Sequence, residues 1–232
     1  MARPLAAMRT GRVSMTPALG ILGGTFDPIH YGHLELAREV KEATGLAEVL
    51  LIPAGDPPHR AAPVATAAHR LAMTELAIAD YRGLAVDARE INRAGRSYTV
   101  LTLEELRAEA PARPLALIVG ADAFAGLPTW HRWLELFDLA HFVVVARPGA
   151  ATLEGALPAP LAREWDRRCT SDPRALSTSP AGAIVRHAIT PRPISASAIR
   201  AALARRDPAA VRGLLPAAVL AYIERNRLYQ PG

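Results

Sequence analysis

The sequence predicts an α/β fold: a doubly wound parallel sheet with helices on both faces and a small helical part at the C-terminal end. Two observations predict it. Short and almost continuously apolar runs recur along the chain, and stretches of helical pattern lie between them. Strands that are apolar on both faces belong in a parallel sheet covered by helices on both sides. Right-handed crossovers between such strands then give the doubly wound, Rossmann-like arrangement.

The strands are predicted from runs that are too short and too apolar to be surface helices. Four of these runs are strong strand candidates and two are weaker. The strong runs are 19–24, 48–54, 115–121 and 141–147, and the weaker runs are 84–90 and 183–189.

Helices are predicted in the intervals between the strands and at the end of the chain. They cover 33–44, 67–80, 99–110, 129–138, 195–205 and 216–227. The last two form the C-terminal helical part, 195–229, of a single domain that we expect to span 18–232.

Two segments do not fit this alternation. Residues 148–182 are rich in Pro, Ala and Ser and have no clear period, so we predict an irregular insertion there. Residues 1–17 carry three arginines and no acidic residue, and we predict a disordered N-terminal extension.

The charge and cysteine content exclude several classes of protein. The net charge is +5, but three of the arginines behind it lie in the first twenty residues, so the body of the domain is nearly balanced. A nucleic-acid-binding domain carries its positive charge on a packed face, so no nucleic-acid partner is expected. The single cysteine, Cys169, rules out an internal disulfide and suits a reducing cytoplasm. No apolar run approaches the roughly 20 residues that span a bilayer, so no membrane partner is expected.

The stretch GGTFDPIHYGH, 23–33, connects the first predicted strand to the first predicted helix. Ligands of open parallel sheets gather at the carboxyl ends of the strands. Gly23 and Gly24 let the backbone approach a ligand closely, and the N–H groups at a helix start favour anions. The stretch is neither a Walker loop nor the dinucleotide fingerprint G-x-G-x-x-G.

Three interpretations of the histidine pair His30 and His33 compete: a metal site, a phosphate site and plain packing. Zinc needs three or four protein ligands, and Asp27 is the one nearby carboxylate. We therefore predict no metal site. Packing accounts readily for one histidine but less readily for two that flank a glycine after a glycine-rich turn.

The tetrapeptide HYGH resembles the HxGH signature of a nucleotidyltransferase superfamily. A second stretch, PRPISASAIR at 191–200, resembles the I-S-x-[ST]-x-x-R signature of the same superfamily. The resemblance implies that both imidazoles reach the triphosphate and stabilise charge during attack on the α-phosphorus, while Gly32 permits close approach of the adenosine. Ser195 and Ser197 stand where a helix N-terminus faces an anion, and Arg200 has a fork suited to phosphates.

The middle of the chain resembles the bacterial nicotinate-nucleotide adenylyltransferases of that superfamily. The matching segments are IPAGDPPHR, HRLAMTELAIAD, RAGRSYTVLTLEEL, LIVGADAFAGLPTWHRW and VVARPG. The resemblance implies a set of ATP-binding residues: Gly23, Gly24, Thr25, Phe26, His30, Gly32, His33, Gly120, Asp122, Arg147, Ser195, Ser197 and Arg200. It implies that the following residues bind the acceptor: His59, Arg60, Tyr98, Thr99, Trp130 and His131.

Within this resemblance, Thr99 bonds the pyridine carboxylate of the acceptor, Trp130 stacks on the pyridine ring, and backbone amides around Trp130 and His131 complete carboxylate recognition. The implied reaction transfers the adenylyl group of ATP to nicotinate mononucleotide in NAD biosynthesis, with His30, His33 and Arg200 as catalytic residues. Mg²⁺ would arrive with ATP, held mainly by phosphates.

Alternatives are an adenylyltransferase for nicotinamide mononucleotide or phosphopantetheine, and a regulatory protein that binds nucleotide without turnover. Whether identical chains associate into an oligomer is left open.

Overall fold

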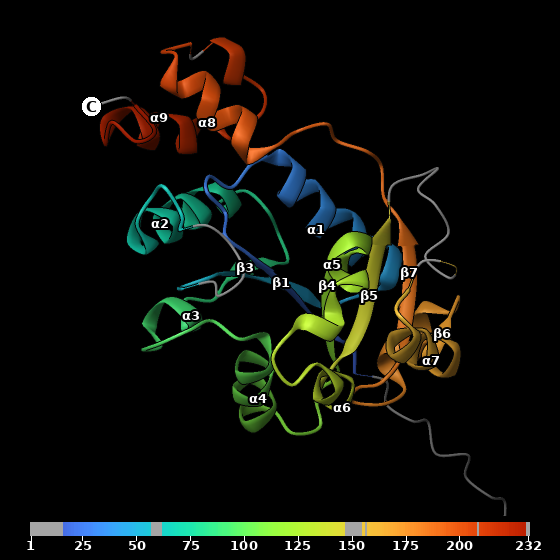
Figure 1. Cartoon of the computed structure of the whole chain (residues 1–232). Coiled ribbons are helices and arrows are strands. Elements are labelled where there is room, and N and C mark those ends of the chain that lie inside the picture. Colours follow the sequence, from blue (N-terminus) through green and yellow to red (C-terminus); the bar gives the residue numbers. More distant parts are fainter. Residues whose placement is uncertain (1–15, 57–61, 147–154, 156, 208, 231–232) are drawn as a thin grey trace, which may run out of the picture.

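The computed structural model describes residues 16–56, 62–146, 155, 157–207 and 209–230. Within them a seven-stranded sheet has the order β3-β2-β1-β4-β5-β7-β6, and every neighbouring pair of strands is parallel (Figure 1). The strands are β1 Leu19–Gly24, β2 Glu48–Pro53, β3 Leu84–Val86, β4 Leu115–Gly120, β5 His141–Ala146, β6 Cys169–Thr170 and β7 Ile184–Ala188. The predicted doubly wound parallel sheet is confirmed.

The order of the strands reverses between β1 and β4. The chain first builds outward from β1 through β2 to β3, then returns to the other side of β1 with β4 and continues through β5. A crevice forms at such a switch point because the connections leave the two central strands in opposite directions. The carboxyl end of β1 is Gly24, so the glycine and histidine stretch begins at this crevice.

The helices that cover the sheet have the following bounds: α1 Tyr31–Thr44, α2 Ala67–Ile78, α3 Arg89–Asn92, α4 Thr99–Glu109, α5 Ala121–Ala125, α6 Leu136–Leu139, α7 Ala159–Arg168, α8 Ala196–Ala204 and α9 Ala217–Arg225. Short 3₁₀ turns are η1 Leu127–Thr129, η2 Trp133–Glu135, η4 Pro173–Ser177 and η5 Ala209–Val211.

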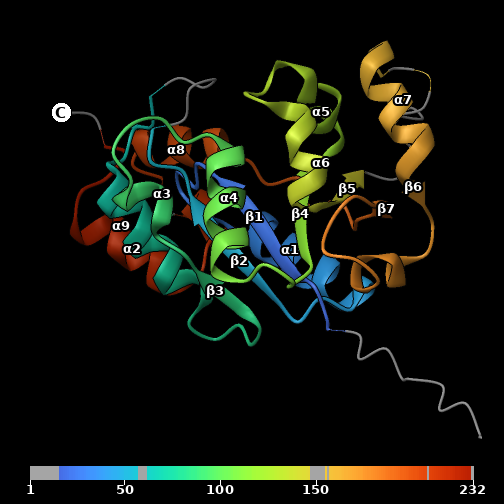
Figure 2. The ribbon, with the colours of Figure 1, turned by 90° about the horizontal axis from the view of Figure 1, so that it is seen from below.

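Two hydrophobic cores lie on opposite faces of the sheet, because successive strand residues point to opposite sides. Along β5, Val143 and Val145 belong to the core that also contains buried residues of α1, α2, α8 and α9. Phe142 and Val144 belong to the core under α4, α5, α6 and α7 (Figure 2). The apolar runs of the sequence are therefore buried from both sides, as their composition predicts.

Helix α1 shows why the first predicted helix forms where it does. His30 is its N-cap in an extended conformation, and the buried side chains Leu34, Ala37 and Val40 follow at the spacing of one helical face. Gly45 ends the helix in the left-handed conformation at φ 69°, where a glycine avoids a Cβ clash. The helix starts two residues before the predicted 33–44.

Three predictions of secondary structure are wrong. The helix expected at 129–138 is broken into η1, η2 and α6, because Trp130 is extended and Arg132 has a left-handed φ of 53°. The irregular insertion expected at 148–182 contains α7, β6 and η4 in its later part, with Leu161 and Trp165 of α7 buried one turn apart. The weak strand at 84–90 ends at Val86, after which the chain turns into α3.

The C-terminal helices α8 and α9 lie together at one end of the molecule, beside α2 (Figure 1). Their predicted ranges, 195–205 and 216–227, agree with the structure to within two residues at each end. Most of the expected extension 1–17 lies outside the described residues. Among the helices that are described, none is long and apolar enough to cross a membrane.

Candidate active site

The two histidines of the first loop lie face to face at the start of α1. Their ring centroids are 3.8 Å apart with an interplanar angle of 25°. The backbone N–H of His30 donates to Nδ1 of His33 over 3.3 Å, so one imidazole helps to satisfy the open N-terminus of the helix. His33 also meets the edge of Phe26, with ring centroids 5.1 Å apart. The pair is thus held by the helix start and by a buried aromatic ring.

Two glycines of this loop make room for particular side chains. A Cβ on Gly24 would lie 2.5 Å from the Phe26 ring, and Phe26 itself has a left-handed φ of 49°. A Cβ on Gly32 would lie 2.9 Å from Nδ1 of His30. The space that Gly32 leaves is filled by the His30 imidazole, while its predicted closeness to adenosine stays a prediction. Around Gly23 a Cβ would meet no atom within 4 Å, so this backbone faces open space.

The late signature folds against the first loop. Ser195 is the N-cap of α8, and its hydroxyl accepts a hydrogen bond from the N–H of Ala198 over 3.1 Å. Nη1 of Arg200 donates to the main-chain carbonyl of Asp27 over 2.7 Å, and Nη2 donates to Oγ of Ser197 over 3.4 Å. Arg200 and Asp27 are 173 positions apart in the sequence. The structure therefore brings the two signatures into one site.

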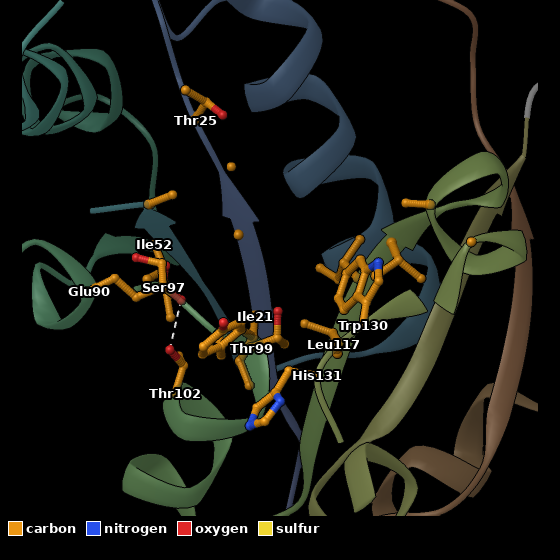
Figure 3. Close-up of a pocket in the computed structure, with 18 of the residues that line it drawn as sticks. Ile21, Thr25, Ile52, Glu90, Ser97, Thr99, Thr102, Leu117, Trp130 and His131 are labelled. Carbon is orange, nitrogen blue, oxygen red and sulfur yellow. Dashed lines mark hydrogen bonds between the residues drawn. The ribbon is translucent and has the colours of Figure 1, made fainter. Parts of the chain in front are cut away.

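A pocket of about 310 Å³ opens beside this loop (Figure 3). Its lining comes from β1, β2 and β4 with the loops that follow them, from α3, α4 and α5, and from the region of η1. The lining residues are Ile21, Gly23, Gly24, Thr25, Ile52, Ala54, Glu90, Ser97, Tyr98, Thr99, Thr102, Leu117, Ile118, Val119, Ala123, Gly126, Thr129, Trp130 and His131. The pocket is the crevice expected at the switch point, and it is mostly apolar with a few polar groups, as small-molecule sites are.

Four residues predicted to bind the acceptor line this pocket. Tyr98 is the N-cap of α4 and Thr99 is its first residue, while Trp130 ends η1. The rings of Tyr98 and His131 lie 4.5 Å apart between centroids. The N–H of Trp130 donates to the carbonyl of Leu127 over 2.9 Å, so in this structure it is engaged in the turn. The backbone of His131 remains the predicted donor for a carboxylate.

The remaining predicted residues are placed differently. Gly120 ends β4 and Asp122 lies in the first turn of α5, both exposed and outside the pocket lining. They stand at the carboxyl edge of the sheet, and their contact with a nucleotide stays a prediction. His59, Arg60 and Arg147 lie outside the described residues.

Sequence reasoning missed a polar group at the far wall of the pocket. The carboxylate of Glu90 accepts a hydrogen bond from Oγ1 of Thr102 over 2.7 Å, and burial raises the pKa of this carboxyl. Beside it, Oγ of Ser97 accepts from the N–H of Gly55 over 2.9 Å and from that of Asp56 over 3.2 Å. These bonds tie the loop after β2 to the start of α4. No spacing in the sequence predicts these hydrogen bonds, because the loop after β2, helix α3 and the start of α4 meet only in the folded chain.

A buried arginine was also missed. Arg70 of α2 is 1% exposed, and burial lowers the pKa of its guanidinium. Nη1 donates to the carbonyl of Thr25 over 2.8 Å, and Nη2 donates to the carbonyl of Gly55 over 3.2 Å. Its planar fork therefore braces the loop after β1 against the loop after β2. The available signal was a cation at a buried helical position, since Met73, Thr74 and Ala77 follow on the same face.

Burial of His30 makes the stability of the fold depend on pH. Its side chain is 5% exposed, and desolvation lowers its pKa from the ordinary 6.5 to about 4. The unfolded chain therefore binds the proton more readily, so the stability that His30 contributes is complete above pH 6.5 and is lost as the pH falls toward 4. We expect the free energy of unfolding to fall by about 2 kcal/mol more in the wild type than in His30→Gln between about pH 7.5 and pH 5.

Urea titrations of both proteins at the two pH values measure this difference. The pKa of His141 is also lowered by burial, but His141 is present in both proteins and its effect cancels. An equal loss of stability in the two proteins would contradict a buried neutral imidazole at position 30.

The described residues contain no group of three or more His, Cys, Asp or Glu side chains that could hold a metal ion. Apart from the Glu90 carboxyl in the pocket wall, the polar groups in and beside the pocket are imidazoles, hydroxyls, the Arg200 guanidinium and backbone N–H groups at helix starts. Such groups suit a polyanionic ligand.

Comparison with known sequences agrees with this description. Residues 21–202 match the family described as cytidylyltransferase-like. The chain is 50% identical over 217 residues to a protein of Dechloromonas aromatica named "Probable nicotinate-nucleotide adenylyltransferase", covering 93% of this chain and 99% of the relative. It is also 50% identical over 214 residues to a protein of the same name from Halorhodospira halophila, covering 92% and 94% of the two chains.

Solved structures share the fold. Plasmodium falciparum nicotinic acid mononucleotide adenylyltransferase complexed with NaAD superposes with a TM-score of 0.70 at 16% identity, over 92% of this chain and 97% of that one. The same protein complexed with APC gives a TM-score of 0.67 at 15% identity, with the same coverage.

Proposed function

This chain belongs to the cytidylyltransferase-like family and, within its relatives, to the nicotinate-nucleotide adenylyltransferases, and we propose that it joins ATP and nicotinate mononucleotide by direct in-line transfer. An oxygen of the mononucleotide 5′-phosphate attacks the α-phosphorus of ATP. The bond from that phosphorus to the α,β-bridging oxygen breaks, and pyrophosphate leaves. The product is nicotinate adenine dinucleotide.

The observation that carries this mechanism is the meeting of the two signatures beside one pocket. The stacked pair His30 and His33 and the guanidinium of Arg200 stand at the carboxyl end of β1. The pocket adjoins them through Gly23, Gly24 and Thr25. A triphosphate on the histidine side and an acceptor in the pocket would bring their reacting atoms together, and positioning of this kind is a large part of catalysis.

On the ATP side, each group has a role that needs no protein nucleophile. The imidazoles of His30 and His33 stabilise charge that develops on the α-phosphate in the transition state. Nδ1 of His30 is buried without a hydrogen-bond partner among the described residues, and an unsatisfied buried atom of this kind is consistent with a catalytic role. Ser195, Ser197 and Arg200 hold the departing pyrophosphate at the start of α8. Mg²⁺ would enter with ATP and neutralise phosphate charge while held mainly by phosphate oxygens and water.

On the acceptor side, the half-buried ring of Trp130 provides a platform for the pyridine ring. Thr99 offers its hydroxyl to the pyridine carboxylate at the start of α4, where helix N–H groups also favour an anion. Two features support this assignment. Thr99 and Trp130 line the same pocket, and the Plasmodium protein of similar fold is described in complex with NaAD.

One assay tests the proposal. We expect the purified protein, with ATP and Mg²⁺, to release pyrophosphate with nicotinate mononucleotide in clear preference to nicotinamide mononucleotide or phosphopantetheine. The carboxylate is the physical reason, because the amide lacks the negative charge that the proposed partners, the Thr99 hydroxyl and the nearby backbone N–H groups, would bind. Faster release with the amide would contradict the acceptor assignment. Absence of release with all three acceptors would contradict the catalytic role and favour a regulatory nucleotide-binding protein.

A further inference from the structure

A buried carboxylate that the proposed chemistry does not use belongs to the first loop itself. Asp27 is 5% exposed and is not part of the pocket lining. Its Oδ2 accepts from the N–H of Val64 over 2.8 Å, and its Oδ1 accepts from the N–H of Ala65 over 3.1 Å and from the hydroxyl of Tyr229 over 2.7 Å. One side chain therefore holds the segment before α2 and the end of the chain.

The main chain of Asp27 serves the triphosphate half of the site. Its carbonyl accepts the 2.7 Å hydrogen bond from Nη1 of Arg200, and the same nitrogen lies 4.0 Å from its Oδ2. Asp27 also precedes His30 by three positions, within the turn that leads into α1. Any shift of Asp27 is thus passed both to Arg200 and to the histidine at the helix start.

The backbone after α9 turns sharply and brings the Tyr229 side chain to Asp27. Arg227 and Tyr229 both have left-handed backbone conformations, with φ of 52° and 62°. For residues with a Cβ this conformation is unfavourable, so tertiary contacts must offset it. Tyr229 is 8% exposed, and burial and the Asp27 carboxylate raise the pKa of its phenol. The hydroxyl therefore stays protonated at neutral pH and acts as a donor to Asp27.

We infer that Asp27 and Tyr229 are positioning residues for ATP. The Tyr229 hydroxyl and the N–H groups of Val64 and Ala65 fix the carboxylate, and the fixed residue presents its carbonyl to Arg200. The inference rests on the proposed function, because it takes Arg200 and His30 as ATP-binding groups. Tyr229, which follows α9, thereby supports the nucleotide site without touching the nucleotide.

The effect should fall on ATP rather than on the acceptor. The described hydrogen bonds of Asp27 go to Val64, Ala65, Tyr229 and Arg200. The predicted acceptor residues come instead from the start of α4 and from η1. A change at Tyr229 should therefore separate the KM values of the two substrates, which a general loss of stability would not do.

The test compares Tyr229→Phe with Tyr222→Phe. Each variant removes one hydroxyl from a tyrosine near the C-terminus, and the Tyr222 hydroxyl lies 2.9 Å from Nδ1 of His69 on α2 and has no described hydrogen bond to Asp27. We expect Tyr229→Phe to raise the KM for ATP about tenfold, the loss that matches one hydrogen bond to a charged group. Its kcat should fall and its KM for nicotinate mononucleotide should stay unchanged. Tyr222→Phe should leave all three values as in the wild type.

Asp27→Asn provides a second variant. It removes the charge and turns an amide N–H₂ toward one of the N–H or O–H donors, so a larger loss in the same ATP parameters is expected. Melting temperatures report folding, and Tyr229→Phe decides alone if Asp27→Asn does not fold. An unchanged KM for ATP and kcat in Tyr229→Phe would overturn the inference, as would a parallel rise in both KM values.

Calorimetric binding of α,β-methylene-ATP, without any acceptor, separates this inference from the proposed function. Weaker binding of the analogue to Tyr229→Phe than to Tyr222→Phe supports the positioning role whichever acceptor the enzyme uses. Equal binding to the two variants contradicts it. Absence of turnover by the wild-type protein concerns the proposed reaction and leaves this comparison valid.

Discussion

Replacing His33 with alanine is expected to lower kcat about 100- to 1,000-fold, the loss typical of removing one group that stabilises transition-state charge. The dissociation constant for ATP should change far less, because the charge that His33 meets grows only as the α-phosphorus is attacked. Pyrophosphate release gives kcat, and calorimetry with ATP in the absence of acceptor gives the dissociation constant. A fall in kcat no larger than the loss of ATP affinity would contradict a role in the transition state.

His33 also has a structural role at the N-terminus of α1, so the alanine variant needs a control for stability. Its Nδ1 accepts the N–H of His30 at the N-terminus of α1, so alanine should also lower stability by about 1 kcal/mol through the lost cap. Glutamine at this third helical position can accept the same N–H, as in a capping box. His33→Gln should therefore restore the melting temperature while kcat stays low. Recovery of kcat in His33→Gln would show that His33 acts mainly by capping the helix.

Replacing Trp130 with alanine is expected to raise the KM for nicotinate mononucleotide about 10- to 100-fold, since stacking of an aromatic side chain on a base contributes about 1–3 kcal/mol. The KM for ATP should change little, because Trp130 lines the pocket from η1 while the phosphate-binding groups lie on the first loop and α8. Steady-state kinetics with each substrate varied in turn measure the two values.

Trp133 is the matched control. It lies three residues further along and packs edge-on against Phe137, with ring centroids 6.2 Å apart, but it is not part of the pocket lining. Trp133→Ala should lower the melting temperature and leave the KM for the acceptor unchanged. If Trp133→Ala raises this KM as much as Trp130→Ala does, Trp130 contributes packing and does not serve as a platform for the pyridine ring.

Much of the fold could be predicted because local composition carries it. The apolar runs at 19–24, 115–121 and 141–147 became β1, β4 and β5 to within one residue at each end, since central parallel strands are buried on both faces. The errors arose where the backbone departs from its apparent pattern. Arg132 adopts a left-handed conformation that no helical period predicts. Helix α7 buries only Leu161 and Trp165 amid charged residues, so its low apolar content concealed an amphipathic helix.

The sequence by itself determined the chemistry at the start of α1 and α8: two histidines around a glycine, and two serines with an arginine one turn later. These signals are local, because a helix start and a glycine turn are built from adjacent residues. Only the tertiary structure decided that Asp27, Arg70 and Tyr229 support those groups. Tyr229 and Asp27 are 202 positions apart, and a hydrogen bond across that distance exists only because the sheet order and the docking of α9 on α2 bring Tyr229 to the loop after β1.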